Sequence, residues 1–135
     1  MSVRVSADLR DRLQREAARV GEPPASLAER YIEEGLRQHS HPLIRFVDGP
    51  AGRRARLMSG PDVWEVVSFI RRSAAVGEAK VTHAATWFGI AGAQVEAALA
   101  YYGDFASEID DRIRLNERAQ AEAKRIADGR LRLLA

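Results

Sequence analysis

The chain opens on a short alternation of polar and apolar residues. Residues 2–6 read Ser-Val-Arg-Val-Ser, which is the period of a strand that buries one face. Two amphipathic helical patterns follow, separated by Gly21 and a Pro-Pro pair that cannot continue the first helix. A lone strand leaves its backbone N–H and C=O groups unpaired, so we expect two copies to pair their strands across a twofold axis. The predicted dimerisation residues are Val3, Val5, Leu9, Leu13, Leu27, Tyr31 and Ile32.

A β-hairpin is predicted next. Alternating segments at 43–47 and 54–58 flank the turn sequence Asp-Gly-Pro-Ala-Gly at 48–52. Asp62 and Glu65 have the spacing of a capping box and predict the start of a helix. The hairpin places arginines on one face and at the loop edge, and this face either binds phosphate or is a solvated strand face. Its candidates for DNA contact are Arg53 and Arg54, beside Arg45 and Arg56.

Residues 81–100 have the spacing of a helix-turn-helix module. Small Ala84 and Ala85, a turn at Gly89 and inward-facing Val95 and Ala98 agree with that pattern. The exposed positions of its second helix include no basic residue, although phosphate neutralisation dominates affinity for DNA. We therefore interpret this module as one that packs or dimerises.

The last segment is highly charged. Residues 104–128 predict a long polar helix that ends at Gly129 and is weakly ordered in isolation. Leucines then alternate with arginines at 130–134. Exposed leucines need a covering surface, which is either another protein or the chain's own dimer.

Composition narrows the function classes. The chain has 135 residues, 46% of them hydrophobic and 30% charged, which is typical of a globular protein. It contains no cysteine, which excludes disulfides, cysteine zinc sites and a thiol nucleophile. No apolar run approaches the roughly 20 residues of a membrane span, and no leader opens the chain. We expect a soluble cytoplasmic protein with no membrane partner.

The net charge and the candidate catalytic residues say less about the function than the composition does. The net charge is +2, with seven basic against four acidic residues in 41–80 and a nearly uncharged block at 81–103. All basic residues but two are arginine, which suits phosphate and guanine contacts but also follows from a GC-rich genome. His39 and His41 lack further metal ligands, and no acid–base pair or phosphate-binding loop is present. We expect no enzyme activity, no metal and no cofactor.

On the strand pattern, the gap at Gly21 and the second helix start at Pro24, residues 2–38 resemble the ribbon-helix-helix family of bacterial DNA-binding proteins. The resemblance implies a dimer whose two-stranded ribbon enters the major groove. It implies that base edges are read by Ser2, Arg4 and Ser6, with Arg4 able to bind guanine in a bidentate way. It also implies phosphate binding at the start of the second helix, by Pro24, Ala25 and Ser26.

A second resemblance covers residues 41–115. His-Pro-Leu-Ile at 41–44, Asp-Gly-Pro-Ala-Gly-Arg-Arg at 48–54, Asp-Val-Trp-Glu-Val-Val at 62–67 and Gln-Val-Glu-Ala-Ala-Leu-Ala-Tyr-Tyr at 94–102 resemble a small helix-turn-helix domain found in VapB-like antitoxins. This implies the antidote half of a type II toxin–antitoxin pair, whose toxin is a PIN-domain ribonuclease. In such antitoxins the C-terminal segment wraps the toxin and a basic side chain enters its acidic metal site. The implied toxin-binding residues are Ile126, Arg130, Leu131, Arg132, Leu133 and Leu134.

The sequence therefore predicts a mainly α protein in three parts. These are a ribbon-helix-helix domain for DNA binding and dimerisation (1–38), a hairpin plus helix-turn-helix-like domain (41–103), and a C-terminal helix with a toxin-binding tail (104–135). The predicted function is an antitoxin that neutralises a ribonuclease toxin and represses its own operon by binding operator DNA, as a homodimer or a higher even-numbered assembly. The alternatives are a stand-alone ribbon-helix-helix repressor and a dimeric interaction module without DNA affinity.

Overall fold

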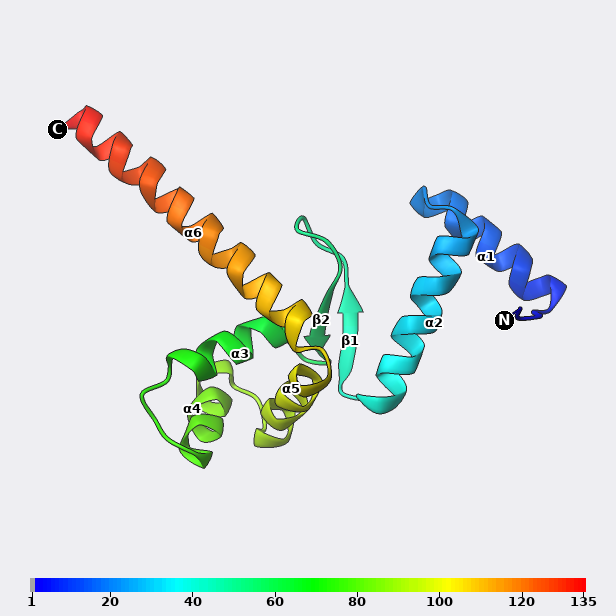
Figure 1. Cartoon of the computed structure of the whole chain (residues 1–135), viewed down its shortest axis with the longest axis horizontal. Helices are drawn as coiled ribbons and strands as arrows, with labels where there is room; N and C mark the ends of the chain where they lie inside the picture. The colour runs from blue at the N-terminus through cyan, green and yellow to red at the C-terminus, as the bar shows by residue number, and fades with distance from the viewer. Residues whose placement is uncertain (1) are drawn as a thin grey trace. The chain divides into compact units, whose positions relative to one another are not determined.

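The computed structural model describes residues 2–135 (Figure 1). Within these residues lie six α-helices and one two-stranded antiparallel sheet, which confirms the predicted mainly α class. The chain divides into two compact units, an N-terminal unit that ends at Ser40 and a second unit, His41–Ala135. The division falls within residues 38–42, where the polar sequence Gln-His-Ser-His-Pro separates two patterns of apolar residues.

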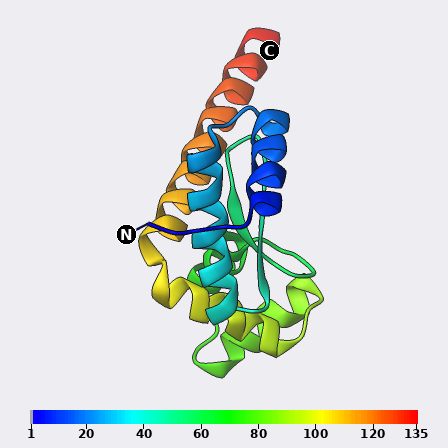
Figure 2. The same cartoon turned by 90° about the vertical axis from the view of Figure 1, so that its right-hand side faces the viewer.

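The N-terminal unit is a helical hairpin of α1 (Ala7–Val20) and α2 (Pro24–Ser40), which lie side by side (Figure 2). Ser6 caps α1, and its Oγ accepts the Leu9 N–H at 3.1 Å. Gly21 ends the helix with a φ of 73°, which glycine adopts without a steric penalty. Within residues 2–40 the buried side chains are those of Ala17 and Leu27. A single copy of this unit therefore buries very little apolar surface.

Residues 2–6, where the sequence predicts a strand, do not form one within the described chain. The backbone at Ser6 is extended, with φ −63° and ψ 156°. The hydrogen-bond ladder of a strand needs a second strand alongside, and the one sheet in residues 2–135 is built from later residues. The strand prediction is therefore wrong for the single chain, and pairing with a second copy stays a prediction.

The second unit begins with the predicted hairpin. Strands β1 (Ile44–Val47) and β2 (Arg54–Leu57) pair antiparallel, with Ile44 opposite Leu57 and Phe46 opposite Ala55. Each strand is one residue shorter at its outer end than predicted. Helix α3 (Val63–Arg72) follows, and the predicted capping box of Asp62 and Glu65 is present.

Helices α4 (Glu78–Phe88) and α5 (Gly92–Asp104) are joined by a short connection. Gly89 begins it with a φ of 65° and donates its N–H to carbonyls of the last turn of α4. Ala84, Val95 and Ala98 are fully buried, as their spacing predicts. They belong to one core with the hairpin and α3, in which Tyr101 is the largest fully buried side chain.

Helix α6 (Ala106–Leu134) closes the chain and extends beyond the other elements of its unit (Figure 1). Its first turns place Ile109 and Ile113 in the core. The predicted stop at Gly129 is wrong, because the helix continues through it to Leu134. Glycine inside a helix costs only about 1 kcal/mol relative to alanine. Strong helix formers on both sides and the absence of a following proline outweigh that cost.

Candidate functional site

The N-terminal unit exposes an apolar face, which we call the N-terminal face. Of the seven predicted dimerisation residues, Leu27 is buried, Leu13 is half-buried and the other five are exposed. The exposed fraction reaches 63% for Val3 and 55% for Ile32. Val3 also lines an open groove of about 860 Å³ along α2, together with Ala28 and Ile32. The face consists of Val3, Val5, Leu9, Tyr31, Ile32 and Leu36.

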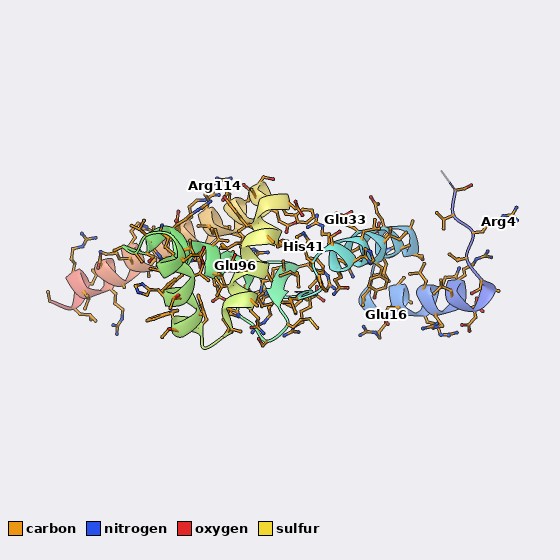
Figure 3. The ribbon with its side chains drawn as sticks, turned by 90° about the horizontal axis from the view of Figure 1, so that it is seen from below. Arg4, Glu16, Glu33, His41, Glu96 and Arg114 are labelled. Atoms are coloured by element: carbon orange, nitrogen blue, oxygen red, sulfur yellow. The ribbon has the colours of Figure 1, made fainter. Side chains whose placement is uncertain are left out.

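The predicted base-reading residues lie before α1. Ser2 and Arg4 are exposed, and the Arg4 side chain points away from the ribbon of the helices (Figure 3). The Ser6 hydroxyl oxygen already accepts the Leu9 N–H, so its proton is the group left for a base. Arg4 is therefore the strongest hydrogen-bond donor of this segment.

The start of α2 is also exposed. Pro24 has no N–H, and the Leu27 N–H donates to the Pro23 carbonyl at 3.1 Å. The amides of Ala25 and Ser26 therefore begin the helix without an intrahelical acceptor. These two are the donors that a phosphate could use.

The hairpin arginines are held in ion pairs, which the sequence pattern does not reveal. Arg54 Nε lies 2.5 Å from Asp62 Oδ2, and Arg56 Nη1 lies 3.4 Å from Asp62 Oδ1. Arg53 Nη1 lies 3.1 Å from Asp48 Oδ1. The predicted DNA contacts of Arg53 and Arg54 would therefore compete with carboxylates of the same unit.

A groove lies where the hairpin tip faces α6, and we call it the hairpin groove. Arg112 of α6 holds the tip, because its guanidinium donates to the carbonyls of Ala51 at 2.9 Å and of Arg53 at 3.3 Å. Two adjoining cavities of about 490 and 380 Å³ make up the groove. The residues that line both cavities are Ala51, Arg54, Trp64, Arg112 and Leu115.

A polar cluster fixes the start of α6 against α3 and α5. The Tyr102 hydroxyl accepts from Arg71 Nη2 at 2.6 Å and donates to Asp110 Oδ1 at 2.9 Å. Arg71 also forms an ion pair with Asp110. The hydrogen bond from Arg71, and next that from Tyr102, holds the pKa of Asp110 below its usual value. These contacts attach the first turns of α6 to α3 and α5 within the second unit.

His41 lies at the start of the second unit. Its side chain is 8% exposed, and Nε2 lies 2.7 Å from Asp104 Oδ2. The ring packs edge-on against Tyr101, with the ring centroids 5.3 Å apart. Residues 2–135 contain no group of three side chains able to hold a metal ion. Through its contacts with Asp104 and Tyr101, His41 connects the first residues of the unit to α5.

Helix α5 offers little to DNA. Gln94, its one residue suited to a base edge, is half-buried and accepts a hydrogen bond from the Ser59 hydroxyl at 2.9 Å. On α4, Trp87 is 72% exposed and stacks on Phe69, with the ring centroids 5.7 Å apart. This part of the surface is apolar and nearly uncharged rather than basic.

The C-terminal part of α6 carries the predicted toxin-binding residues, and all six are exposed. The exposed fraction is 59% for Ile126 and 87% for Leu133. Because α6 continues through Gly129, these residues belong to one helix and not to an extended tail. Any partner therefore meets a helical surface.

Comparisons with family models, with curated proteins and with solved structures gave no match to this chain. Among residues 2–135, no helix combines the length and the apolar character that a membrane crossing requires.

Proposed function

We propose that this chain is a dimeric DNA-binding antitoxin that represses its own operon and neutralises a ribonuclease toxin. The observation that carries the proposal is the N-terminal face. Val3 and Val5 alternate with Arg4 on the segment before α1, and the apolar residues on the helices of the N-terminal face are exposed. A second copy is the partner that supplies both a strand for residues 2–6 and a matching apolar face.

Pairing of two copies has a direct consequence for Arg4. An antiparallel ribbon formed by residues 2–6 turns Val3 and Val5 toward the helices and the residues between them outward. The exposed Arg4 then projects from the ribbon in both copies, and arginine binds the O6 and N7 atoms of guanine in a bidentate way. The amides at the start of α2 can hold a backbone phosphate.

The proposed toxin-binding element is the C-terminal part of α6. An amphipathic helix with exposed leucines and isoleucine suits binding into an apolar groove of another protein. Arg130 and Arg132 are exposed on the same turns, and they can reach an acidic site on the partner. If the product of the adjacent gene does not bind to this chain, the alternative is a stand-alone repressor.

DNA binding is tested by Arg4→Ala, measured on DNA from upstream of the gene and on a random duplex of equal length. Loss of a bidentate guanine contact costs about 1–3 kcal/mol. The dimer loses this contact in both copies, so we expect the specific affinity to be weaker by roughly 30-fold or more. Binding to the random duplex is expected to change far less.

The matched control is Arg19→Ala, which removes the same charge from the far end of α1. Arg19 pairs with Glu16 on the helix surface, so we expect little change in specific binding. If both variants weaken binding to both duplexes equally, Arg4 contributes only charge and the ribbon does not read bases. If neither duplex binds the unaltered chain, the protein is an interaction module without DNA affinity.

A further inference from the structure

The outer face of the β1–β2 hairpin carries more positive than negative charge. Side chains alternate along a strand, and the residues turned away from the core are Arg45, Arg54 and Arg56. Within residues 2–135, Asp62 is the carboxylate that forms ion pairs on this face, with Arg54 and Arg56. Three arginines against one carboxylate leave two positive charges without a counter-charge.

Two of these positive charges lie directly opposite each other. Arg45 of β1 is the register partner of Arg56 of β2. At such positions the two Cβ atoms are about 4.5–5.5 Å apart, and like charges there destabilise a sheet. An acidic residue in either place would have stabilised the hairpin instead. The pair therefore costs the hairpin stability, and a bound anion would offset that cost.

The fold leaves both guanidinium groups with an unsatisfied donor. The Nε atoms of Arg45 and Arg56 are buried, and neither has a hydrogen-bond partner within the described chain. Buried polar atoms are nearly always paired, and a charge that is partly removed from water attracts an opposite charge more strongly. Both side chains keep part of their surface exposed, 34% in the case of Arg56. An anion can therefore approach the pair from the solvent side.

Gly60 and Asp62 hold the Arg56 guanidinium in place. A Cβ on Gly60 would lie 2.8 Å from Arg56 Nη2, so the absence of a side chain lets the guanidinium pack against the backbone. Arg56 Nη1 lies 3.4 Å from Asp62 Oδ1, which is longer than the roughly 2.7–2.9 Å of a charge-assisted hydrogen bond. The other oxygen of Asp62 is bound by Arg54. Asp62 therefore orients Arg56 without neutralising it.

We propose that Arg45 and Arg56 together bind a terminal phosphate group. Two adjacent guanidinium groups offer forked N–H donors to a tetrahedral oxyanion. A phosphate monoester has three acceptor oxygens and about 1.5–2 negative charges at neutral pH, which match the two positive charges left over on this face. A phosphate of the DNA backbone carries only one. The ligand class is therefore free phosphate or a phosphate monoester. The site lies in the second unit, so it does not rest on the proposed dimer or on its DNA binding.

The test is a titration of the full chain with inorganic phosphate, methyl phosphate and dimethyl phosphate. At about pH 7.5 the first two carry close to two negative charges, whereas the diester carries one. Sodium chloride keeps the ionic strength constant, so that screening is equal in all samples. The readout is the NMR signal of each arginine Nε–H group. We expect saturable shifts of the Arg45 and Arg56 signals with the two dianions, and binding of the diester at least about tenfold weaker.

Arg45→Gln and Arg72→Gln form a matched pair of variants. Both remove one positive charge, but Arg72 is exposed at the other end of α3 from Asp62. We expect Arg45→Gln to weaken phosphate binding about tenfold or more, which is the usual effect of losing a charge-assisted hydrogen bond. Arg72→Gln is expected to leave the affinity unchanged.

Arg45→Glu separates loss of the site from loss of the fold. It places a carboxylate opposite Arg56, so we expect it to abolish phosphate binding while raising the melting temperature by about 1–5 °C. A lower melting temperature in this variant would contradict the claim that the two arginines repel each other.

The three probes also distinguish the sources of the phosphate group. A response to inorganic phosphate alone supports the site with the free ion as its ligand, and a response to methyl phosphate as well supports a monoester. An equal response to dimethyl phosphate overturns the proposal in favour of a nucleic-acid backbone. The absence of a saturable shift with any probe, or equal weakening by Arg45→Gln and Arg72→Gln, overturns it in favour of a solvated strand face.

Discussion

Asp62 joins three parts of the second unit through a carboxylate that is only 7% exposed. It accepts from Arg54 Nε at 2.5 Å, from Arg56 Nη1 at 3.4 Å and from Trp64 Nε1 at 3.2 Å. It also caps α3, and its own N–H donates to Glu65 at 2.9 Å. Replacing it with alanine removes the cap and leaves two guanidinium groups without their carboxylate.

The expected cost of Asp62→Ala follows from these contacts. Loss of an N-cap destabilises by about 1 kcal/mol. Breaking a fully buried ion pair costs about 3–5 kcal/mol, but Arg54 and Arg56 are 24% and 34% exposed, so water replaces much of the lost interaction. We expect a total decrease of about 2–3 kcal/mol in the free energy of unfolding. Asp62→Asn keeps a cap and an acceptor, so we expect about half that decrease.

Urea unfolding of the full chain, followed by tryptophan fluorescence, measures this decrease, because Trp64 lies beside the carboxylate. Asp48→Ala is the matched control on the same hairpin. Its carboxylate is 81% exposed and pairs with Arg53 at the surface, so we expect a change within about 0.5 kcal/mol. An Asp62→Ala chain as stable as the unaltered chain, or an equal loss in Asp48→Ala, would refute the reasoning.

Two further predictions concern α6. The pKa of Asp110 is lowered by Arg71 and then by Tyr102, so the stability it contributes is present above its ordinary pKa of 3.8 and is lost as pH falls through the lowered folded value. Thermal unfolding between about pH 2 and pH 6 should therefore show a steeper acid loss in the unaltered chain than in Asp110→Asn, and parallel curves would contradict this. Removing residues 129–135 takes Leu131, Leu133 and Leu134 from α6, so the truncated chain should fail to inhibit the proposed toxin, and full inhibition would remove this segment from the proposed mechanism.

Patterns of one or two helical turns were enough to predict most of the fold. The capping box at Asp62, the turn at Gly89 and the buried Ala84, Val95 and Ala98 are all present. These features depend on neighbours in the sequence, so local reasoning reaches them. Gly129 was misjudged because a glycine stop also needs the chain to turn away from the helix, and here the helix continues.

Long-range pairings could not be predicted in the same way. The sequence pattern places Arg54 on a basic strand face, and only the folded structure shows that Asp62 forms an ion pair with it. Arg112 and the cluster of Arg71, Tyr102 and Asp110 were missed, because their partners lie far away in the sequence. The strand predicted at residues 2–6 presents a different difficulty, since a single chain offers no strand beside it and the proposed partner is a second copy. Val3 and Val5 are exposed in the single chain, which is the observation that led us to propose this partner.

Dimerisation through the N-terminal face is the central claim, and the mass of the unaltered chain in solution tests it most directly. We expect sedimentation equilibrium at micromolar concentration to give twice the 15.0 kDa of one chain. Ile32→Asp places a charge on the N-terminal face, so we expect that variant to have the mass of a single chain. A single-chain mass for the unaltered protein, or a double mass for Ile32→Asp, would contradict the claim.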